Sequence, residues 1–184
     1  MQVLEVRVSE ETIHLYIQLT DTMTRESFVE EYNHPFLVQH VAAAPSRPAR
    51  PHSRTTKIRL EDIQLELPPE PASQRENRVH AVRARRSSTP DGSVMVGRTE
   101  ENDIILSSDE VSKDHARISH DPLQDLYTIT DQGSTNGTSL NGERLAVGKP
   151  RNLIDGDIVS FSSADDYQFY LSPGFYDFLI KQKR

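Results

Sequence analysis

The sequence predicts an all-β domain in the C-terminal half of the chain, on three observations. Short apolar or alternating runs with the length of β-strands recur from residue 79 to residue 171. Clusters of Gly, Pro, Asn and Asp separate most of these runs. No run with clear helical periodicity interrupts them. This arrangement is typical of a β-sandwich or a β-barrel.

The expected strands follow one another along this half of the chain. They cover residues 79–83, 94–96, 104–106, 116–118, 126–130, 139–140, 158–161 and 167–171. Asn141-Gly142 predicts a tight hairpin turn. Asp155-Gly156-Asp157 predicts a turn rather than a calcium site, because too few carboxylates follow it at ligand spacing.

A short C-terminal helix is predicted within residues 173–184. Ser172 suits the N-cap position and Pro173 the first helical position, so we expect the helix over residues 173–182. Its apolar face would carry Phe175, Phe178 and Leu179.

The sequence predicts that residues 1–41 form a small mixed α/β segment. Residues 1–19 are rich in alternating and β-branched positions, which favours strands with a turn near Ser9. Asp21 or Thr22 could cap a helix over residues 23–32, and residues 36–41 predict one more strand. We expect this segment to dock on the sandwich as an appendage. In the alternative, residues 36–41 add a strand to the sandwich, and the linker that follows them leaves the sandwich and returns to it.

Residues 42–77 are predicted to form a linker, which precedes a domain that spans residues 78–172. Prolines recur at a spacing of three near its start, and residues 57–67 form a short strand-like stretch. Residues 42–88 carry ten basic and five acidic side chains, whereas residues 89–184 carry nine basic and sixteen acidic ones. The acidic domain is therefore a poor general binder of nucleic acid, which requires a broad basic face.

Composition excludes several other classes of protein. The chain has 184 residues and no cysteine, so it forms no disulfide or thiolate metal site, and a reducing cytoplasm suits it. Its N-terminus is too short and too charged for a signal peptide, and no apolar run is long enough to span a membrane. We predict no metal and no cofactor.

Polar residues suited to binding a phosphate collect in three predicted loops. Arg98 offers a planar cationic fork, Ser112 and Thr135 offer hydroxyl groups, and Lys113 offers an amine or its backbone N–H. The Asn136 amide can pair with a peptide backbone.

Six motifs in this region resemble the forkhead-associated (FHA) domain over about residues 78–172. They are Gly97-Arg98, 102–106, Ser112-Lys113-Asp114-His115, Ser134-Thr135-Asn136-Gly137-Thr138, Asn141-Gly142 and 153–157. The resemblance implies an antiparallel β-sandwich whose apical loops bind a phosphothreonine peptide.

The resemblance also divides the site residues by role. It implies that Arg98, Ser112 and Thr135 contact the phosphate, and that Asn136 holds the peptide backbone just after the phosphothreonine. It implies structural support from three further residues, namely Gly97, His115 and Gly137. A catalytic triad of Ser112, His115 and Asp131 is rejected, because the sequence has no nucleophile elbow and the resemblance places His115 inward.

The expected function is a phosphothreonine-reading adaptor in Ser/Thr-kinase signalling, without enzyme activity. Its partner would be a phosphothreonine-containing protein linked to such a kinase, and neither nucleic acid nor a membrane is expected. The alternative is a phospho-independent scaffold or oligomerisation module that uses the sandwich faces. Because Asp109, Glu110 and Asp114 surround Ser112, acidic peptide residues downstream of the phosphothreonine should be disfavoured.

Threonines in basic surroundings are candidate phosphate acceptors. They are Thr55, Thr56 and Thr89. A phosphorylated Thr55 or Thr56 could bind the chain's own site, in cis as a latch or in trans between copies, while a passive linker is the simpler alternative.

Overall fold

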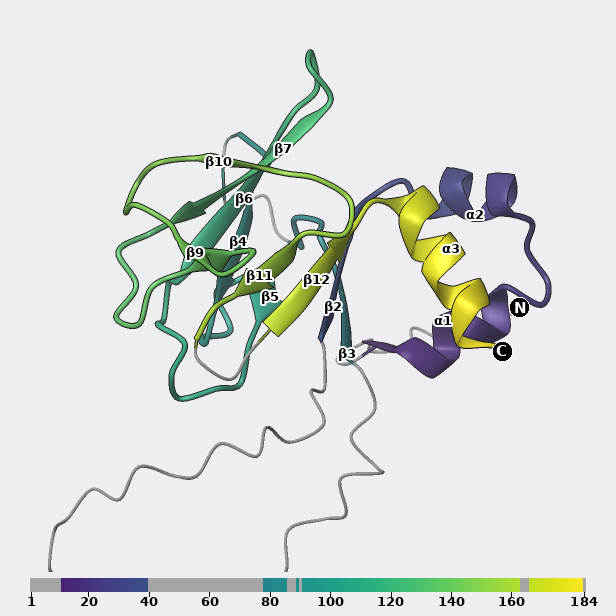
Figure 1. Ribbon diagram of the computed structural model, residues 1–184, viewed down its shortest axis with the longest axis horizontal. Coiled ribbons are helices and arrows are strands. Elements are labelled where there is room, and N and C mark those ends of the chain that lie inside the picture. The colour runs from purple at the N-terminus through teal and green to yellow at the C-terminus, as the bar shows by residue number, and fades with distance from the viewer. Residues whose placement is uncertain (1–10, 40–77, 86–88, 90, 163–165, 184) are drawn as a thin grey trace, which may run out of the picture.

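Two β-sheets facing each other form a sandwich, and three helices pack on one side of it (Figure 1). The computed structural model describes residues 11–39, 78–85, 89, 91–162 and 166–183. The elements are β1 Glu11–Thr12, α1 Ile13–Leu19, α2 Arg25–Glu31, β2 Phe36–Gln39, β3 Arg78–Ala81, β4 Val94–Gly97, β5 Ile104–Ile105, β6 Ala116–Asp121, β7 Leu126–Asp131, β8 Ser139–Leu140, β9 Glu143–Arg144, β10 Arg151–Leu153, β11 Ile158–Ser160, β12 Asp166–Tyr170 and α3 Ser172–Gln182.

Both strands from the N-terminal residues, β1 and β2, belong to the same one of the two sheets. One sheet has the order β1-β3-β2-β12-β11-β8-β9, and the other has the order β10-β7-β6-β4-β5. Their facing surfaces enclose an apolar core that includes Val96, Ile118, Ile129 and Phe169, each no more than 1% exposed. The predicted β-sandwich is confirmed. The pair β4–β5 is parallel, so the sandwich is not antiparallel throughout.

Strand β2 has apolar side chains on both faces, because each face packs against a separate core. Leu37 belongs to the core between the sheets, whereas Phe36 and Val38 belong to a second core under the helices. Strands buried on both faces have continuous apolar runs, as Phe36-Leu37-Val38 does. β2 pairs with β12 on one side and with β3 on the other. The expectation of a separate N-terminal appendage is therefore wrong at these residues, and the alternative of an added strand is correct.

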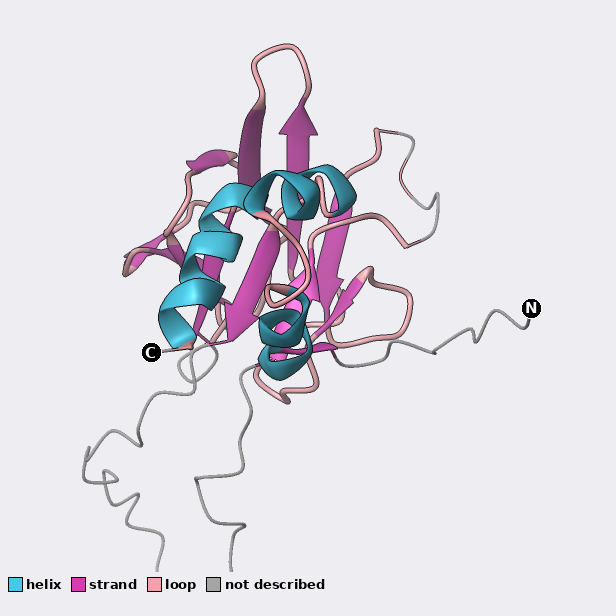
Figure 2. Cartoon of the chain, turned by 90° about the vertical axis from the view of Figure 1, so that its right-hand side faces the viewer, coloured by secondary structure: helices cyan, strands magenta, loops and turns pink. Residues whose placement is uncertain are grey.

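The predicted strand over residues 13–19 is also wrong, because α1 occupies it. Tyr16 is 2% exposed and packs edge-on against Phe36 and Phe175, so this helix contributes to the second core. Ile13, Tyr16 and Ile17 have helical spacing, and burial of that face outweighs the strand propensity of β-branched residues. Figure 2 shows the three helices together on the same side of the strands.

The other two helices match their predictions apart from the caps. α2 begins after Thr24, whose Oγ1 accepts a hydrogen bond from the Ser27 N–H at 3.3 Å, rather than after Asp21 or Thr22. α3 begins after Leu171, and the Ser172 hydroxyl is buried without a hydrogen-bond partner. Phe175 and Leu179 are fully buried, as the predicted apolar face requires. None of the helices in the described part of the chain is long and apolar enough to cross a bilayer.

Candidate functional site

Three loops meet at one end of the sandwich, and backbone hydrogen bonds hold them together. The loops follow β4, precede β6 and connect β7 to β8. Arg98 N donates to Ser112 O at 3.0 Å, which joins the first loop to the second. Gln132 N donates to His115 O at 2.9 Å, which joins the third loop to the second. The predicted site residues are therefore brought together in space.

His115 connects the second and third loops from inside the protein. Its ring is fully buried, and its Nδ1 accepts a hydrogen bond from Ser112 N at 3.0 Å. Its Nε2 lies 3.4 Å from Gly137 O, so the proton belongs on Nε2. Burial lowers the pKa of His115, although Gly137 O and Asp131 oppose this shift, so the ring stays neutral at physiological pH. Neither ring nitrogen contacts the Ser112 hydroxyl, and this geometry does not form a catalytic triad.

Ser112 and Thr135 lie side by side across two loops. Ser112 Oγ accepts a hydrogen bond from Thr135 N at 2.9 Å and lies 3.4 Å from Thr135 Oγ1. Both hydroxyl groups belong to residues that are not buried. A ligand oxygen placed here could bind two hydroxyl donors that the fold already holds in position.

Arg98 and Asn136 present the charged and amide groups of the same region. Arg98 Nη1 lies 3.2 Å from Asp109 Oδ1, and 42% of its side chain is exposed, so the guanidinium remains accessible to a ligand. Asn136 Nδ2 donates to Glu110 O at 2.7 Å. Lys113 is exposed, and its carbonyl oxygen accepts a hydrogen bond from Asn102 Nδ2 at 2.7 Å.

The two glycines of the motif meet different local constraints. A Cβ atom on Gly97 would collide with Lys113 O and would lie 2.7 Å from Asn102 Nδ2. Gly137 has a φ of +83°, and a Cβ atom there would lie 2.6 Å from Arg144 Nε. Gly97 therefore excludes larger residues for steric reasons, because the atom in the way belongs to the backbone, whereas Gly137 is favoured chiefly by its backbone conformation.

Three residues that the sequence did not single out as site residues support this end of the sandwich. Buried Asn102 joins the first loop to the second, because its Nδ2 donates to Thr99 O at 3.1 Å and to Lys113 O at 2.7 Å. The Arg144 guanidinium covers Gly137. Asp131 is fully buried and accepts hydrogen bonds from Gly133 N, Ser134 N, Ser134 Oγ and Thr138 Oγ1, at 2.6 to 3.1 Å.

Burial raises the pKa of Asp131, but these hydrogen bonds together outweigh burial and hold the pKa below its usual value. The signal in the sequence was an Asp at the end of a strand, followed by Gly133 and Ser134 at turn spacing.

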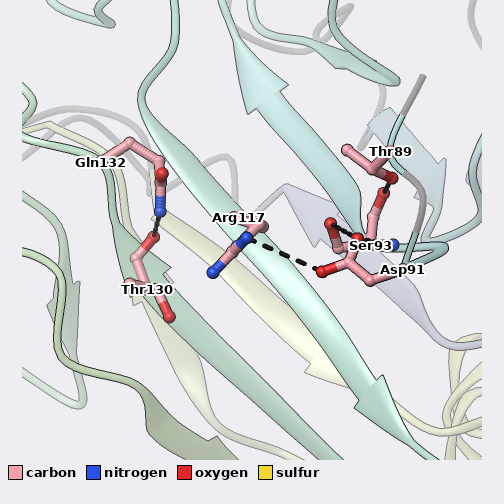
Figure 3. Close-up of polar contacts among 6 residues, drawn as sticks. All are labelled: Thr89, Asp91, Ser93, Arg117, Thr130 and Gln132. Atoms are coloured by element: carbon pink, nitrogen blue, oxygen red, sulfur yellow. Dashed lines mark hydrogen bonds and ion pairs between the residues drawn. The ribbon is translucent and has the colours of Figure 1, made fainter.

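Of the three candidate phosphate acceptors, the structure describes Thr89. Thr55 and Thr56 lie outside the described residues. Thr89 is half-buried and donates a hydrogen bond from Oγ1 to Ser93 O at 2.6 Å (Figure 3). In the same view Asp91 accepts from Ser93 Oγ at 2.7 Å and faces Arg117 at 3.7 Å, on the outer face of the five-stranded sheet.

Comparison with known proteins decides the family. The FHA domain family model matches residues 94–162, which hold all three loops. This chain contains an FHA domain. The resemblance inferred from the motifs is therefore confirmed, and the β2, β3 and helical elements lie outside the matched FHA residues.

Relatives of this FHA domain occur in larger proteins of different kinds. One is an ABC transporter ATP-binding/permease protein of Mycobacterium tuberculosis, 36% identical over 76 residues, which are 41% of this chain and 8% of that protein. Another is protein phosphatase 2C 70 of Arabidopsis thaliana, 30% identical over 92 residues, which are 46% of this chain and 16% of that protein. Among solved structures, Mycobacterium tuberculosis EmbR in complex with a low affinity phosphopeptide is 32% identical, with a TM-score of 0.38. That match covers 43% of this chain and 20% of the EmbR chain. The chain thus spans less than a fifth of the length of the two curated relatives.

Proposed function

We propose that this chain is an adaptor that binds phosphothreonine-containing segments of proteins in Ser/Thr-kinase signalling. The observation that carries the proposal is the convergence of Arg98, Ser112, Thr135 and Asn136 at one end of the FHA sandwich. A phosphate group brings about −1.5 to −2 charges and three strong acceptor oxygens. One guanidinium and two hydroxyl groups match those needs.

The arrangement suits binding rather than chemistry. Each charge-assisted hydrogen bond to the phosphate is worth about 1.5–3 kcal/mol. A few such bonds, reduced by the cost of ordering the peptide, correspond to micromolar affinity, about −8 kcal/mol. We assign Arg98, Ser112 and Thr135 to the phosphate, Asn136 to the peptide backbone, and Lys113 to a weaker additional contact. Gly97, His115 and Gly137 hold these groups in place.

The test is titration of the full chain with one peptide in its threonine, phosphothreonine and phosphoserine forms. Arg98→Ala should abolish measurable binding of the phosphothreonine form. Arg151→Ala is the matched control, because Arg151 is also an exposed arginine in an ion pair, here with Glu143 at 3.1 Å. Binding that ignores the phosphate and survives Arg98→Ala would instead support a phospho-independent scaffold.

The segment between β2 and β3 could supply one such ligand within the chain. The pairings Gln39–Tyr167, Tyr167–Val159 and Val159–Leu140 place the end of β2 level with Leu140 in β8. Because β2 and β8 run in opposite directions, the chain leaves β2 toward the start of β8, just after the third loop. Gln39, the last described residue before Thr55 and Thr56, therefore lies toward the end of the sandwich that holds the site. We propose self-binding of this segment after phosphorylation of either threonine.

Self-binding predicts competition with an added phosphopeptide. The phosphorylated chain should bind the phosphopeptide more weakly than the phosphorylated Thr55→Ala/Thr56→Ala variant does, since a tethered ligand has a high effective concentration. Equal binding by the two forms would rule out self-binding and leave the adaptor function intact.

A further inference from the structure

A single stretch of the second loop, residues 109–112, accepts hydrogen bonds from three N–H groups at the candidate site in the free protein. Asp109 Oδ1 lies 3.2 Å from Arg98 Nη1, and Glu110 O accepts from Asn136 Nδ2 at 2.7 Å. Ser112 Oγ accepts from Thr135 N at 2.9 Å. Two donors assigned to the ligand, Arg98 and Asn136, thus already have an acceptor in this stretch, so a ligand must compete with it for them.

Only one of these three acceptors carries a charge. The Glu110 carbonyl and the Ser112 hydroxyl are neutral, whereas Asp109 places a carboxylate on the guanidinium that would hold the phosphate. We propose that Asp109 is an affinity- and specificity-determining residue, which makes the site accept a phosphate and reject a singly charged carboxylate. This inference rests on the proposed function, because it assumes that Arg98 binds the phosphate.

Displacing Asp109 costs little for a ligand with enough charge. Its side chain is 102% exposed, so the released carboxylate returns to full hydration. Exposed ion pairs contribute little to stability, because solvent and salt screen them. A phosphate with nearly two charges and three acceptor oxygens gains more from Arg98 than the single Asp109 contact loses.

A ligand carboxylate gains no such surplus. A glutamate in the place of the phosphothreonine offers Arg98 the same group that Asp109 already offers. Asp109 is also attached to the protein, so it competes at a high effective concentration. The wild-type site should therefore reject peptides in which glutamate replaces the phosphothreonine.

The experiment titrates the full-length chain with two peptides. The first is the tightest-binding sequence from a phosphothreonine peptide library, and the second has glutamate in place of its phosphothreonine. Asp109→Asn removes the competing charge at an exposed position with little change in shape. Asp114→Asn is the matched control, because Asp114 is an exposed aspartate of the same loop with no ion pair to Arg98 among the contacts of the described residues.

We expect Asp109→Asn to bind the phosphothreonine peptide about two- to fivefold more tightly than wild type in low salt. The gain should shrink as salt is added, and the glutamate peptide should also bind more tightly to this variant than to wild type. Asp114→Asn should change the affinity less than twofold. Unchanged or weaker binding by Asp109→Asn would overturn the inference, and so would an equal gain in Asp114→Asn. In either case phosphate-dependent binding that is lost in Arg98→Ala would leave the proposed function standing.

Discussion

Asp155 caps helix α3 from a turn sixteen residues earlier in the chain. Its Oδ1 accepts a hydrogen bond from Leu171 N at 2.7 Å, and its carboxylate packs directly against the Cα of Gly174 in the first turn. The sequence predicted Ser172 as the N-cap, but the Ser172 hydroxyl lacks a hydrogen-bond partner. A carboxylate at a helix N-terminus is favourable, because it faces unpaired N–H groups and the positive end of the helix dipole.

This contact predicts an unusual sign for one substitution. Alanine normally stabilises a helix by about 1 kcal/mol relative to glycine. Gly174→Ala should instead destabilise this protein, because the new methyl group collides with the Asp155 carboxylate. In the Asp155→Ala background the same substitution should become neutral or stabilising. Urea unfolding of the four proteins in this double-mutant cycle measures the change, and a stabilising Gly174→Ala in the wild-type background would contradict the packing.

Gly137→Ala should destabilise the protein more than Gly142→Ala. Both glycines have a φ of +83°, so the two substitutions share the cost of a left-handed backbone, about 1 kcal/mol. Only at Gly137 does the methyl group also meet a side chain, the Arg144 guanidinium, whereas nothing lies within 4 Å at Gly142.

Adding Arg144→Ala should therefore recover part of the loss at Gly137 and none of the loss at Gly142. Thermal unfolding midpoints of the single and double variants measure both effects. Equal losses at the two glycines would show that Arg144 moves aside without cost.

His80 should make the protein less stable in mild acid. Burial, followed by the nearby Arg78 and Arg85, lowers the pKa of His80 to about 4, and its Nε2 is buried without a hydrogen-bond partner. The unfolded chain binds this proton at its ordinary pKa of about 6.5. The contribution of neutral His80 is thus fully present above about pH 6.5 and is lost as the pH falls toward about 4, by at most about 3 kcal/mol.

His80→Leu removes this group, so the variant should lose less stability than wild type between pH 7 and pH 4.5. Free energies of unfolding from urea titrations at several pH values measure the difference. His120→Gln is the control, because His120 is exposed and pairs with Asp125 at 3.0 Å. A wild-type pH profile that matches that of His80→Leu would contradict the assignment.

Asp131→Ala should weaken both folding and phosphopeptide binding. The substitution leaves buried Thr138 without its hydroxyl acceptor and releases Gly133 and Ser134 at the start of the third loop. We expect a loss of about 2–4 kcal/mol in the free energy of unfolding. Asp125→Asn, at the exposed turn between β6 and β7, should change neither property, because asparagine tolerates the left-handed backbone (φ +50°) at this position. Intact binding in a folded Asp131→Ala variant would show that the third loop does not need this support.

Local patterns predicted the candidate site better than the elements around it. Arg98, Ser112 and Thr135 lie in loops whose motifs are contiguous, so their positions follow from short stretches of sequence. The roles of Asn102 and Arg144 depend on contacts between different loops, which spacing along the chain does not reveal.

The wrong predictions about the fold also concern elements that depend on contacts distant in the sequence. The segment 13–19 has strand-like composition, and its helix is stabilised by packing against Phe36 and Phe175, far away in the sequence. The position of β2 between β3 and β12 likewise depends on pairing across long separations. Single-sequence periodicity records which faces are apolar, but not which partner covers them.

The place of β2 in the sheet has a consequence for cutting the chain. A single break between residues 40 and 77 would separate β2 from β3 along the backbone, while the pairings of β2 with both of its neighbours would remain available. We therefore expect the two fragments to reassociate without a covalent link, as in a split protein. Conversely, a chain that begins at residue 78 would leave β12 with an unpaired edge and Phe175 without its stacked partner Phe36.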